Sequence, residues 1–196
     1  MNLDAWRHYL RARIHRALRR PRPAIAAFRD ARAADPRFAR AVHGLAYMLA
    51  GERAWAEAHE AFAAVLQLVP ENTRAWYNFG YVCDQLGHHS EAAAAFERAT
   101  KQDPKLDLAW FGLGRMRTAL GQERAAVEAF ERAAELQPMN GAVWYELGMA
   151  WHRAHEPDRV RAVVDHLNRY QRHHAHKLIV DAGRSDLAHI VADLRT

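Results

Sequence analysis

The chain has 196 residues, of which 50% are hydrophobic and 26% are charged, a balance that is typical of folded globular proteins and argues against disorder. It has no run of about 18 apolar residues and no apolar leader, so the sequence predicts neither a membrane span nor a secretory signal, and we expect a cytoplasmic protein. The single cysteine, Cys83, allows no internal disulfide. The net charge of +5 is uneven, because residues 1–40 carry eleven Arg against three Asp.

Small and aromatic residues recur along the chain with a period of 34 residues. In residues 73–106 the recurring positions hold Trp76, Gly80, Leu86, Gly87, Ala92, Phe96, Ala99 and Pro104. The same offsets in residues 107–140 hold Trp110, Gly114, Leu120, Gly121, Ala126, Phe130, Ala133 and Pro138. This period is typical of arrays of helix-turn-helix units.

Each unit has physical reasons for the residue types that it repeats. Gly80 and Ala92 are small, so they would allow two antiparallel helices to cross closely. Gly87 follows the first predicted helix, where a left-handed turn needs a residue without a side chain, and Pro104 ends the second helix. Cys83 lies on the apolar stripe of the first helix, where we expect it to be an inert core residue.

The first unit, residues 5–38, is regular only in its second half. Its first half has His8 at the position of Trp76 and Arg11 at the position of Phe79, although we expect Leu10 and Ile14 to face the core. An atypical terminal unit is common in repeat arrays. The Arg-rich opening also resembles a mitochondrial presequence, but the residues that follow it in phase favour a genuine repeat.

Residues 39–72 form a clear second unit, and residues 141–174 begin in phase and then drift. Because no proline closes the last unit, we expect the helix that begins at Pro157 to continue to just before Gly183. Ser185 is expected to cap a last helix, which covers the end of the array. Its narrow apolar stripe would consist of Leu187, Ile190, Val191 and Leu194.

The repeated unit resembles the tetratricopeptide repeat family. The resemblance implies an all-α fold, a right-handed α-solenoid of about five repeats with a C-terminal capping helix. The repeats are expected at residues 5–38, 39–72, 73–106, 107–140 and 141–174, with the cap at residues 175–196. We found no linker or low-complexity segment, so one continuous domain, residues 1–196, is the expected organisation.

The resemblance also implies where a ligand binds. In this family the first helices of successive repeats line a concave groove, through side chains at the second, fifth, sixth, ninth and twelfth positions of each repeat. Carried over position by position, the predicted groove residues are Tyr9, Arg13, Arg40, His43, Tyr47, Arg74, Tyr77, Asn78, Tyr81, Asp84, Phe111, Arg115, Tyr145, Met149 and His152.

These side chains are mostly aromatic or basic, so an extended peptide that is acidic or ends in a free carboxylate is the expected partner. Asn78 also matches the central asparagine of the carboxylate clamp found in chaperone-binding relatives. However, Leu108 and Gly112 stand where that clamp has Lys and Arg, which argues against the chaperone-tail mechanism. Tyr and Arg are also common on exposed helix faces, so a plain solvated surface is the competing interpretation.

A non-enzymatic scaffold or adaptor is therefore the predicted function. The sequence contains no nucleophile elbow, no phosphate loop and no paired catalytic acids, and it predicts no cofactor. Two alternatives use the basic N-terminal repeat: RNA binding through Arg13, Arg16 and Arg20, with Trp6 and Tyr9 for stacking, or self-association into a homo-oligomer. Nucleic-acid binding is the weaker alternative, because no motif that reads base edges is present.

Thirteen histidines raise the question of a metal site. The densest group, residues 166–176, contains His173 and His176 three residues apart, but no Asp, Glu or Cys completes a recognisable ligand motif. His88 and His89 lie in a predicted turn between helices, where we expect them to contact water. The sequence therefore predicts no metal site.

Overall fold

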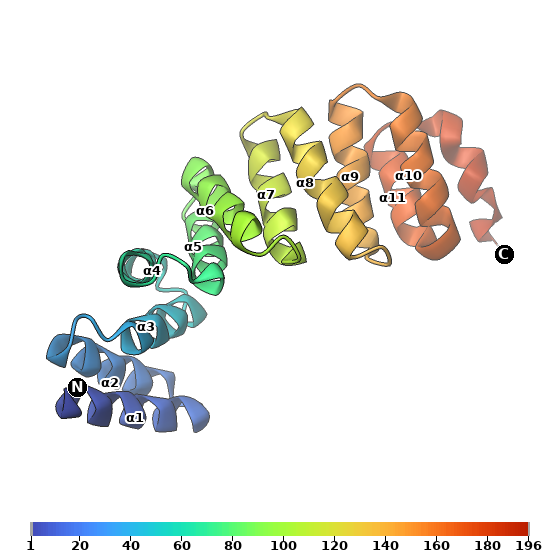
Figure 1. Cartoon of the computed structure of the whole chain (residues 1–196). Helices are drawn as coiled ribbons and strands as arrows, with labels where there is room; N and C mark the ends of the chain where they lie inside the picture. The colour runs from blue at the N-terminus through green and yellow to red at the C-terminus, as the bar shows by residue number, and fades with distance from the viewer. Residues whose placement is uncertain (1, 196) are drawn as a thin grey trace. The chain divides into compact units, whose positions relative to one another are not determined.

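The computed structural model describes the backbone of residues 2–195 and the side chains of residues 2–191. All regular structure in these residues is helical, so the predicted all-α fold class is confirmed (Figure 1). The elements are α1 (Leu3–Ala17), α2 (Pro21–Ala34), α3 (Ala39–Gly51), α4 (Trp55–Leu68), α5 (Thr73–Gln85), α6 (His89–Gln102), α7 (Asp107–Ala119), α8 (Glu123–Leu136), α9 (Gly141–Arg153), α10 (Pro157–Tyr170), α11 (Arg172–Asp181) and the 3₁₀ helix η1 (Ser185–Arg195). None of the helices in this described part is long and apolar enough to cross a bilayer.

The chain divides into two compact units, residues 1–102 and residues 103–196. We call them the N-terminal unit and the C-terminal unit. In each, successive helices pack as neighbours, so that a first helix contacts its own second helix and, within the unit, the second helix of the preceding repeat. The single continuous domain expected from the sequence stays a prediction.

Glycines allow the paired helices to pack closely, as predicted. A Cβ atom at Gly80 on α5 would lie 3.0 Å from the Phe96 ring of α6, and one at Gly114 on α7 would lie 2.7 Å from the Phe130 ring of α8. Both phenylalanines are buried. The recurring Gly and Phe therefore form one contact, in which the ring fills the space that the missing side chain leaves.

The recurring Trp and Pro are also one structural device. The indole Nε1 of Trp76 donates a hydrogen bond to the Pro70 carbonyl oxygen at 2.8 Å. In the C-terminal unit, Trp110 donates in the same way to Pro104 at 3.0 Å and Trp144 to Pro138 at 2.9 Å. Each bond joins a first helix to the loop that precedes it. The half-buried indoles thereby have a partner for the N–H group.

The turn between the two helices of a repeat places one residue in the left-handed region. Gly87 and Gly121 have φ of 76° and 70°, as expected for glycines that follow a helix. The equivalent positions in the other repeats have the same conformation without glycine, since Arg19, Arg53 and His155 have φ of 55°, 58° and 61°. The packing of the helix pair therefore imposes this turn on whichever residue occupies it.

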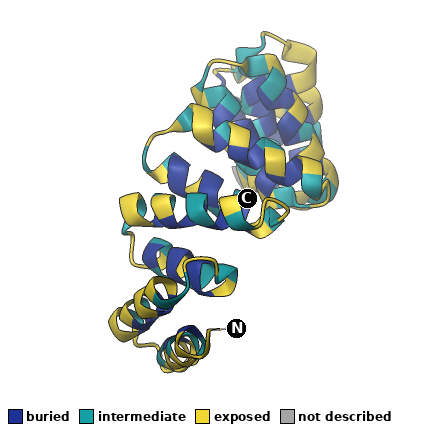
Figure 2. Ribbon diagram, turned by 60° about the vertical axis from the view of Figure 1, so that its left-hand side comes forward, coloured by how far each residue is buried: buried dark blue, intermediate teal, exposed yellow. Residues whose placement is uncertain are grey.

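The prediction that Leu10 and Ile14 face the core is wrong. Both are exposed, and α1 instead packs on α2 through the small residues Ala5 and Ala12. Ile14 is 59% exposed, whereas its equivalent on α5, Val82, is 0% exposed. The reason is that α5 has a preceding second helix, α4, packed on it, whereas none in the described residues packs on that side of α1. Figure 2 shows many exposed positions on this end of the chain.

The predicted long helix from Pro157 to Gly183 is also wrong. The chain leaves the helical conformation at Gln171, with φ of −147° and ψ of 57°, and α11 begins at the next residue. This break lets α11 fold back, so that Ala175, Leu178 and Ile179 are buried with the core of the C-terminal unit. Leu178 packs directly over Gly148 of α9. Burial of such side chains stabilises the folded state by about 1.5–3 kcal/mol each, which outweighs the loss of helical hydrogen bonds at one residue.

The C-terminal cap consists of α11 and η1. The predicted last helix is present but is a 3₁₀ helix, and its Leu187 and Val191 are buried as expected. The Asn168 side-chain amide on α10 donates a hydrogen bond to the Ile190 carbonyl oxygen at 2.9 Å, which holds η1 against α10. Leu194, the last member of the predicted stripe, lies outside the described side chains.

Candidate functional site: a groove in the N-terminal unit

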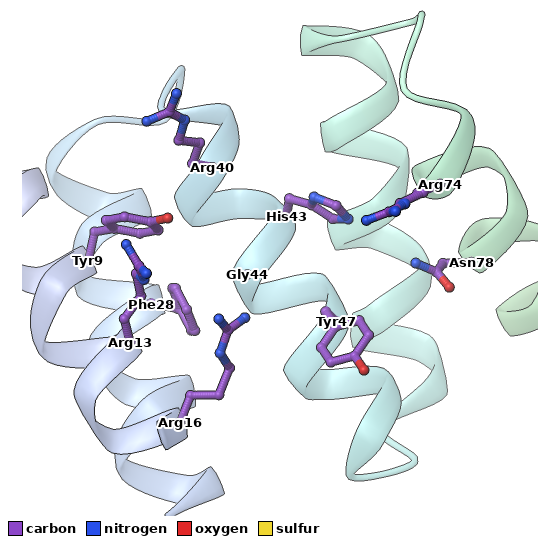
Figure 3. Close-up of a pocket in the computed structure, with 10 residues that line it drawn as sticks. All are labelled: Tyr9, Arg13, Arg16, Phe28, Arg40, His43, Gly44, Tyr47, Arg74 and Asn78. Atoms are coloured by element: carbon purple, nitrogen blue, oxygen red, sulfur yellow. The ribbon is translucent and has the colours of Figure 1, made fainter. Parts of the chain in front are cut away.

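A hollow of about 290 Å³ lies across the first three repeats, within the N-terminal unit. Side chains from α1, α3 and α5 surround it, and one from α2 forms part of its floor (Figure 3). We call it the cationic hollow. Its lining residues are Tyr9, Arg13, Arg16, Phe28, Arg40, His43, Gly44, Tyr47, Arg74 and Asn78.

Four arginines give the cationic hollow its charge, and none of its described lining residues is acidic. Arg13 lies over the Tyr9 ring, with its guanidinium carbon 5.8 Å from the ring centre. Arg16, Arg40 and Arg74 form no ion pair with any carboxylate among the residues that the structure describes. Their charge is therefore available to an anionic ligand.

His43 and Arg74 face each other across the space between α3 and α5 (Figure 3). Burial of the imidazole, and then the positive charge of Arg74, lower the pKa of His43 below its ordinary value of 6.5. The ring is therefore neutral near pH 7, when it can donate a hydrogen bond from one nitrogen and accept at the other. An anion bound here would raise the pKa of His43 again.

Gly44 forms part of the floor of the hollow. A Cβ atom on its backbone would overlap the ring of Phe28, which is buried on α2. The absence of a side chain thus lets the Phe28 ring lie directly against α3 and leaves the hollow open above it. An alanine at this position would close part of the hollow and displace the ring.

A second hollow of about 320 Å³ adjoins the first and shares Tyr47 and Asn78 with it. We call it the aromatic hollow, because Trp55, Phe62 and Tyr81 also line it. The rings of Trp55 and Tyr81 meet edge to face with their centres 6.0 Å apart. The remaining lining residues are Ala50, Gly51 and Arg53.

Asn78 lies where the two hollows meet, and it is half-buried. Its amide makes no hydrogen bond to another side chain or backbone group among the described residues. An amide can donate to a peptide carbonyl and accept from a peptide N–H at the same time. We call the two hollows together the N-terminal groove; it has a cationic end, an aromatic end and an uncommitted amide between them.

The structure brings eight of the predicted groove residues together in this groove. They are Tyr9, Arg13, Arg40, His43, Tyr47, Arg74, Asn78 and Tyr81. Two others from the same unit, Tyr77 and Asp84, line neither hollow. The Tyr77 ring instead packs on Phe96, with ring centres 5.9 Å apart.

Sequence reasoning missed several lining residues. Arg16 occupies the twelfth position of its repeat, as Asp84 does, so the same positional rule could have found it. Trp55 and Phe62 stand on the second helix α4, and a rule restricted to first helices cannot find them. Their aromatic character was the remaining signal, but it is equally typical of core residues.

In the C-terminal unit, three predicted groove residues pack within the unit itself. Phe111 packs on Phe130 with ring centres 5.8 Å apart, and Met149 packs against the core. The Tyr145 hydroxyl donates a hydrogen bond of 2.6 Å to Asp181 on α11, and the Lys177 ammonium lies 3.9 Å from the centre of its ring. Two residues of the C-terminal cap therefore contact Tyr145, which the sequence predicted to bind a ligand.

The last two predicted residues of that unit are the exposed Arg115 and the half-buried His152. A shallow hollow in this unit lies at the loop before α9 and is lined by residues 137–142 with Gln171 and His174. None of the predicted groove residues lines it. A ligand site in the C-terminal unit therefore stays a prediction.

Two further features bear on the alternatives. His166, in the histidine-rich segment, stacks on Trp144 with ring centres 3.8 Å apart, and no group of three potential metal ligands forms around it among the described residues. At the other end, Trp6 and Tyr9 both pack on Phe38, with ring centres 4.8 and 5.0 Å apart. Their contacts within the protein reduce the ring surface that a nucleic-acid base could stack on.

Comparisons with family profiles and with solved structures show which proteins this chain resembles. The tetratricopeptide repeat is matched over residues 49–114 by one family profile and over residues 9–58 and 111–173 by another. The structure is similar to that of YrrB, described as a TPR protein with an unusual peptide-binding site, with a TM-score of 0.82, 21% identity and 92% of each chain covered. It is also similar to MamA, with a TM-score of 0.79, 18% identity, and 95% of this chain and 98% of that chain covered.

A MamA structure from Desulfovibrio magneticus RS-1 gives a TM-score of 0.76 at 18% identity, with 91% of this chain and 96% of that chain covered. No significant match was found among curated proteins. At these identities the structural likeness shows the fold alone. Because one repeat profile matches more than half of the residues, the chain belongs to the tetratricopeptide repeat family.

Proposed function

We propose that this chain is a non-enzymatic interaction scaffold, and that its N-terminal groove binds an extended acidic segment of a partner protein. The observation that carries the proposal is the convergence of four arginines on one hollow whose described lining has no acidic residue. Arginine forms paired hydrogen bonds with carboxylates, which gives both attraction and a fixed geometry. The similarity to YrrB adds that a protein of this fold can hold a peptide.

The order of the two hollows implies a pattern in the bound segment. Acidic side chains, or a terminal carboxylate, would lie at the cationic hollow, and a large apolar or aromatic side chain would fill the aromatic hollow. Between them the Asn78 amide would bind the peptide backbone, which accounts for its lack of a partner in the described structure. All the lining residues except Arg53 stand on helices, so they lose little freedom upon binding, and most of the entropy cost falls on the peptide.

A peptide array tests this pattern. The array would present random peptides with either a free or an amidated C-terminus, and the untagged protein would be the probe. We expect enrichment of Asp and Glu within a few residues of an aromatic or large aliphatic side chain. Preference for the free terminus would assign the terminal carboxylate to the cationic hollow, whereas equal binding would assign acidic side chains. Enrichment of basic or uncharged peptides would refute the proposal.

Variants of the groove then locate the binding site. Asn78→Ala should weaken binding of an enriched peptide by about 1–3 kcal/mol without lowering thermal stability, because it leaves peptide backbone groups unpaired. Arg74→Glu reverses one charge of the cationic hollow and should weaken binding further. The matched control is Arg98→Glu, which makes the same charge change at an exposed residue of α6 that lines neither hollow. Equal losses in both charge variants would exclude the groove.

Self-association through α1 is a second candidate, because an apolar stripe lies exposed on that helix. The stripe consists of Leu3, Leu10 and Ile14, and it continues at Leu18, directly after the helix. Exposed apolar stripes of this kind are typical of interaction surfaces. Light scattering across a range of concentrations tests the idea: a concentration-dependent increase in mass that the double variant Leu10→Glu/Ile14→Glu abolishes would support it, and a constant monomer mass would exclude it.

A further inference from the structure

Outside the groove, the structure brings together three side chains that can bind a metal ion. His59 stands on α4, His88 directly precedes α6, and Glu91 lies in the first turn of α6. One ligand atom from each lies within 4.8 Å of the other two. This group could not be recognised from residue spacing, because His59 is about thirty residues from the other two.

The distances fit a small tetrahedral ion. The Nε2 atom of His59 lies 3.0 Å from the Oε2 atom of Glu91, and the Nδ1 atom of His88 lies 3.5 Å from the same oxygen. Ligand atoms around tetrahedral Zn²⁺, bound at about 2.0–2.1 Å, are separated by roughly 3.3 Å. The two measured separations lie on either side of that value. The third separation, between the ligand nitrogens of the two imidazoles, is no more than 4.8 Å, and the half-exposed His88 can move to adjust it.

Packing within the protein holds the His59 ligand in place. The His59 ring lies tilted against Phe79, with ring centres 4.9 Å apart and planes inclined by 36°. The buried Cys83 lies near enough to Glu91 for the carboxylate charge, together with burial, to raise the pKa of its thiol. His88 and Glu91 are 52% and 44% exposed, which leaves a fourth coordination position open to water.

We propose that His59, His88 and Glu91 form a Zn²⁺ site that joins the second repeat to the third. Two imidazoles and one carboxylate suit Zn²⁺, whereas Mg²⁺ and Ca²⁺ require oxygen ligands. The ion bridges α4 and α6, the second helices of neighbouring repeats, and therefore stabilises their packing. The site lies outside the N-terminal groove, since none of its three residues lines either hollow.

Zinc titration by calorimetry on the untagged, chelator-treated protein tests the proposal, with MgCl₂ as the comparison ion. We expect one Zn²⁺ per chain and no saturable Mg²⁺ binding. Glu91→Gln and His59→Phe should each weaken Zn²⁺ binding at least about tenfold, since loss of even a supporting group has an effect of that size. His59→Phe keeps an aromatic ring on Phe79, so it separates loss of a ligand from loss of packing.

The matched control is His173→Ala/His176→Ala, which removes two histidines that are three residues apart on α11. Its Zn²⁺ affinity should equal that of the wild type. Unfolding supplies a second readout: Zn²⁺ at 100 times the wild-type dissociation constant should lower the unfolding equilibrium constant roughly 100-fold in the wild type, and at most about 10-fold in Glu91→Gln. Absence of saturable binding in the wild type, or binding that Glu91→Gln retains and the control loses, would overturn the proposal.

Discussion

Adding one methyl group at Gly114 should destabilise the protein. A Cβ atom there would lie 2.7 Å from two atoms of the Phe130 ring, whereas carbon atoms in contact prefer about 3.5–4.0 Å. Phe130 is fully buried, so the ring cannot move into solvent. Overpacking of this kind costs about 1–3 kcal/mol, and the greater helix propensity of Ala offsets about 1 kcal/mol of that cost. We therefore expect Gly114→Ala to lower the free energy of unfolding by about 1 kcal/mol, and Gly114→Leu to lower it further.

Urea denaturation followed by far-UV circular dichroism measures this change. The control is Gly51→Ala on α3, because a Cβ atom at Gly51 has no atom within 4 Å; its stability should be unchanged or raised by up to about 1 kcal/mol. Combining Gly114→Ala with Phe130→Leu should cost less than the sum of the two single changes, since the smaller side chain relieves the overlap. If Gly114→Ala is as stable as Gly51→Ala, the close helix crossing that we describe is wrong.

Three further predictions concern single residues. His155→Gly should raise the free energy of unfolding by about 0.5–1 kcal/mol, because glycine adopts the left-handed conformation without strain. Gly121→Ala should lower it by about 1–2 kcal/mol for the same reason. Changes of the opposite sign in urea denaturation would refute the turn assignment. Burial and the Glu91 charge raise the pKa of the Cys83 thiol to about 12, so a thiol reagent should label it at pH 8 only as fast as the protein opens. The pKa of His43 is lowered in the folded state, so the unfolded state binds more protons below about pH 6.5. The free energy of unfolding should therefore decrease as the pH falls through that range, and the decrease should be smaller in His43→Gln. Binding of an acidic peptide should instead strengthen as the pH falls, because a bound carboxylate raises the pKa of His43, and this gain should be absent in His43→Gln.

The regular part of the fold could be predicted because its determinants are local. In residues 73–140 the glycines at the helix crossings and turns recur at a fixed period, and each crossing glycine contacts a residue about half a repeat away. The contact between Gly80 and Phe96 is an example, since both members of the pair are visible in the repeated pattern. The left-handed conformation of His155 could not be read from its residue type, because packing of the helix pair imposes it.

The two errors of fold arose from packing between distant residues. The break at Gln171 depends on Leu178 reaching Gly148 on α9, and no feature of the residues around the break signals it. The exposure of Ile14 depends on whether another helix covers its side of α1. Periodicity shows that a helix has an apolar stripe, but it does not show which neighbour the stripe meets.

The candidate site was predictable to the extent that first helices supply it. The cationic hollow collects residues at the predicted positions, including Arg40 and Arg74. The aromatic hollow depends on Trp55, which stands on a second helix, whereas the groove positions of the family are all on first helices. The three potential Zn²⁺ ligands come from two helices and a turn, so only the folded structure brings them together.

Reversing the charge of Arg74, and separately that of a bound peptide, tests the central proposal most directly. The measurement is the affinity of an array-selected acidic peptide, and of the same peptide with its acidic residues replaced by Lys, for the wild type and for Arg74→Glu. We predict that Arg74→Glu loses affinity for the acidic peptide and gains affinity for the Lys peptide, while Arg98→Glu behaves as the wild type does. If Arg74→Glu binds both peptides as the wild type does, or if Arg98→Glu shows the same exchange, the N-terminal groove is not the binding site.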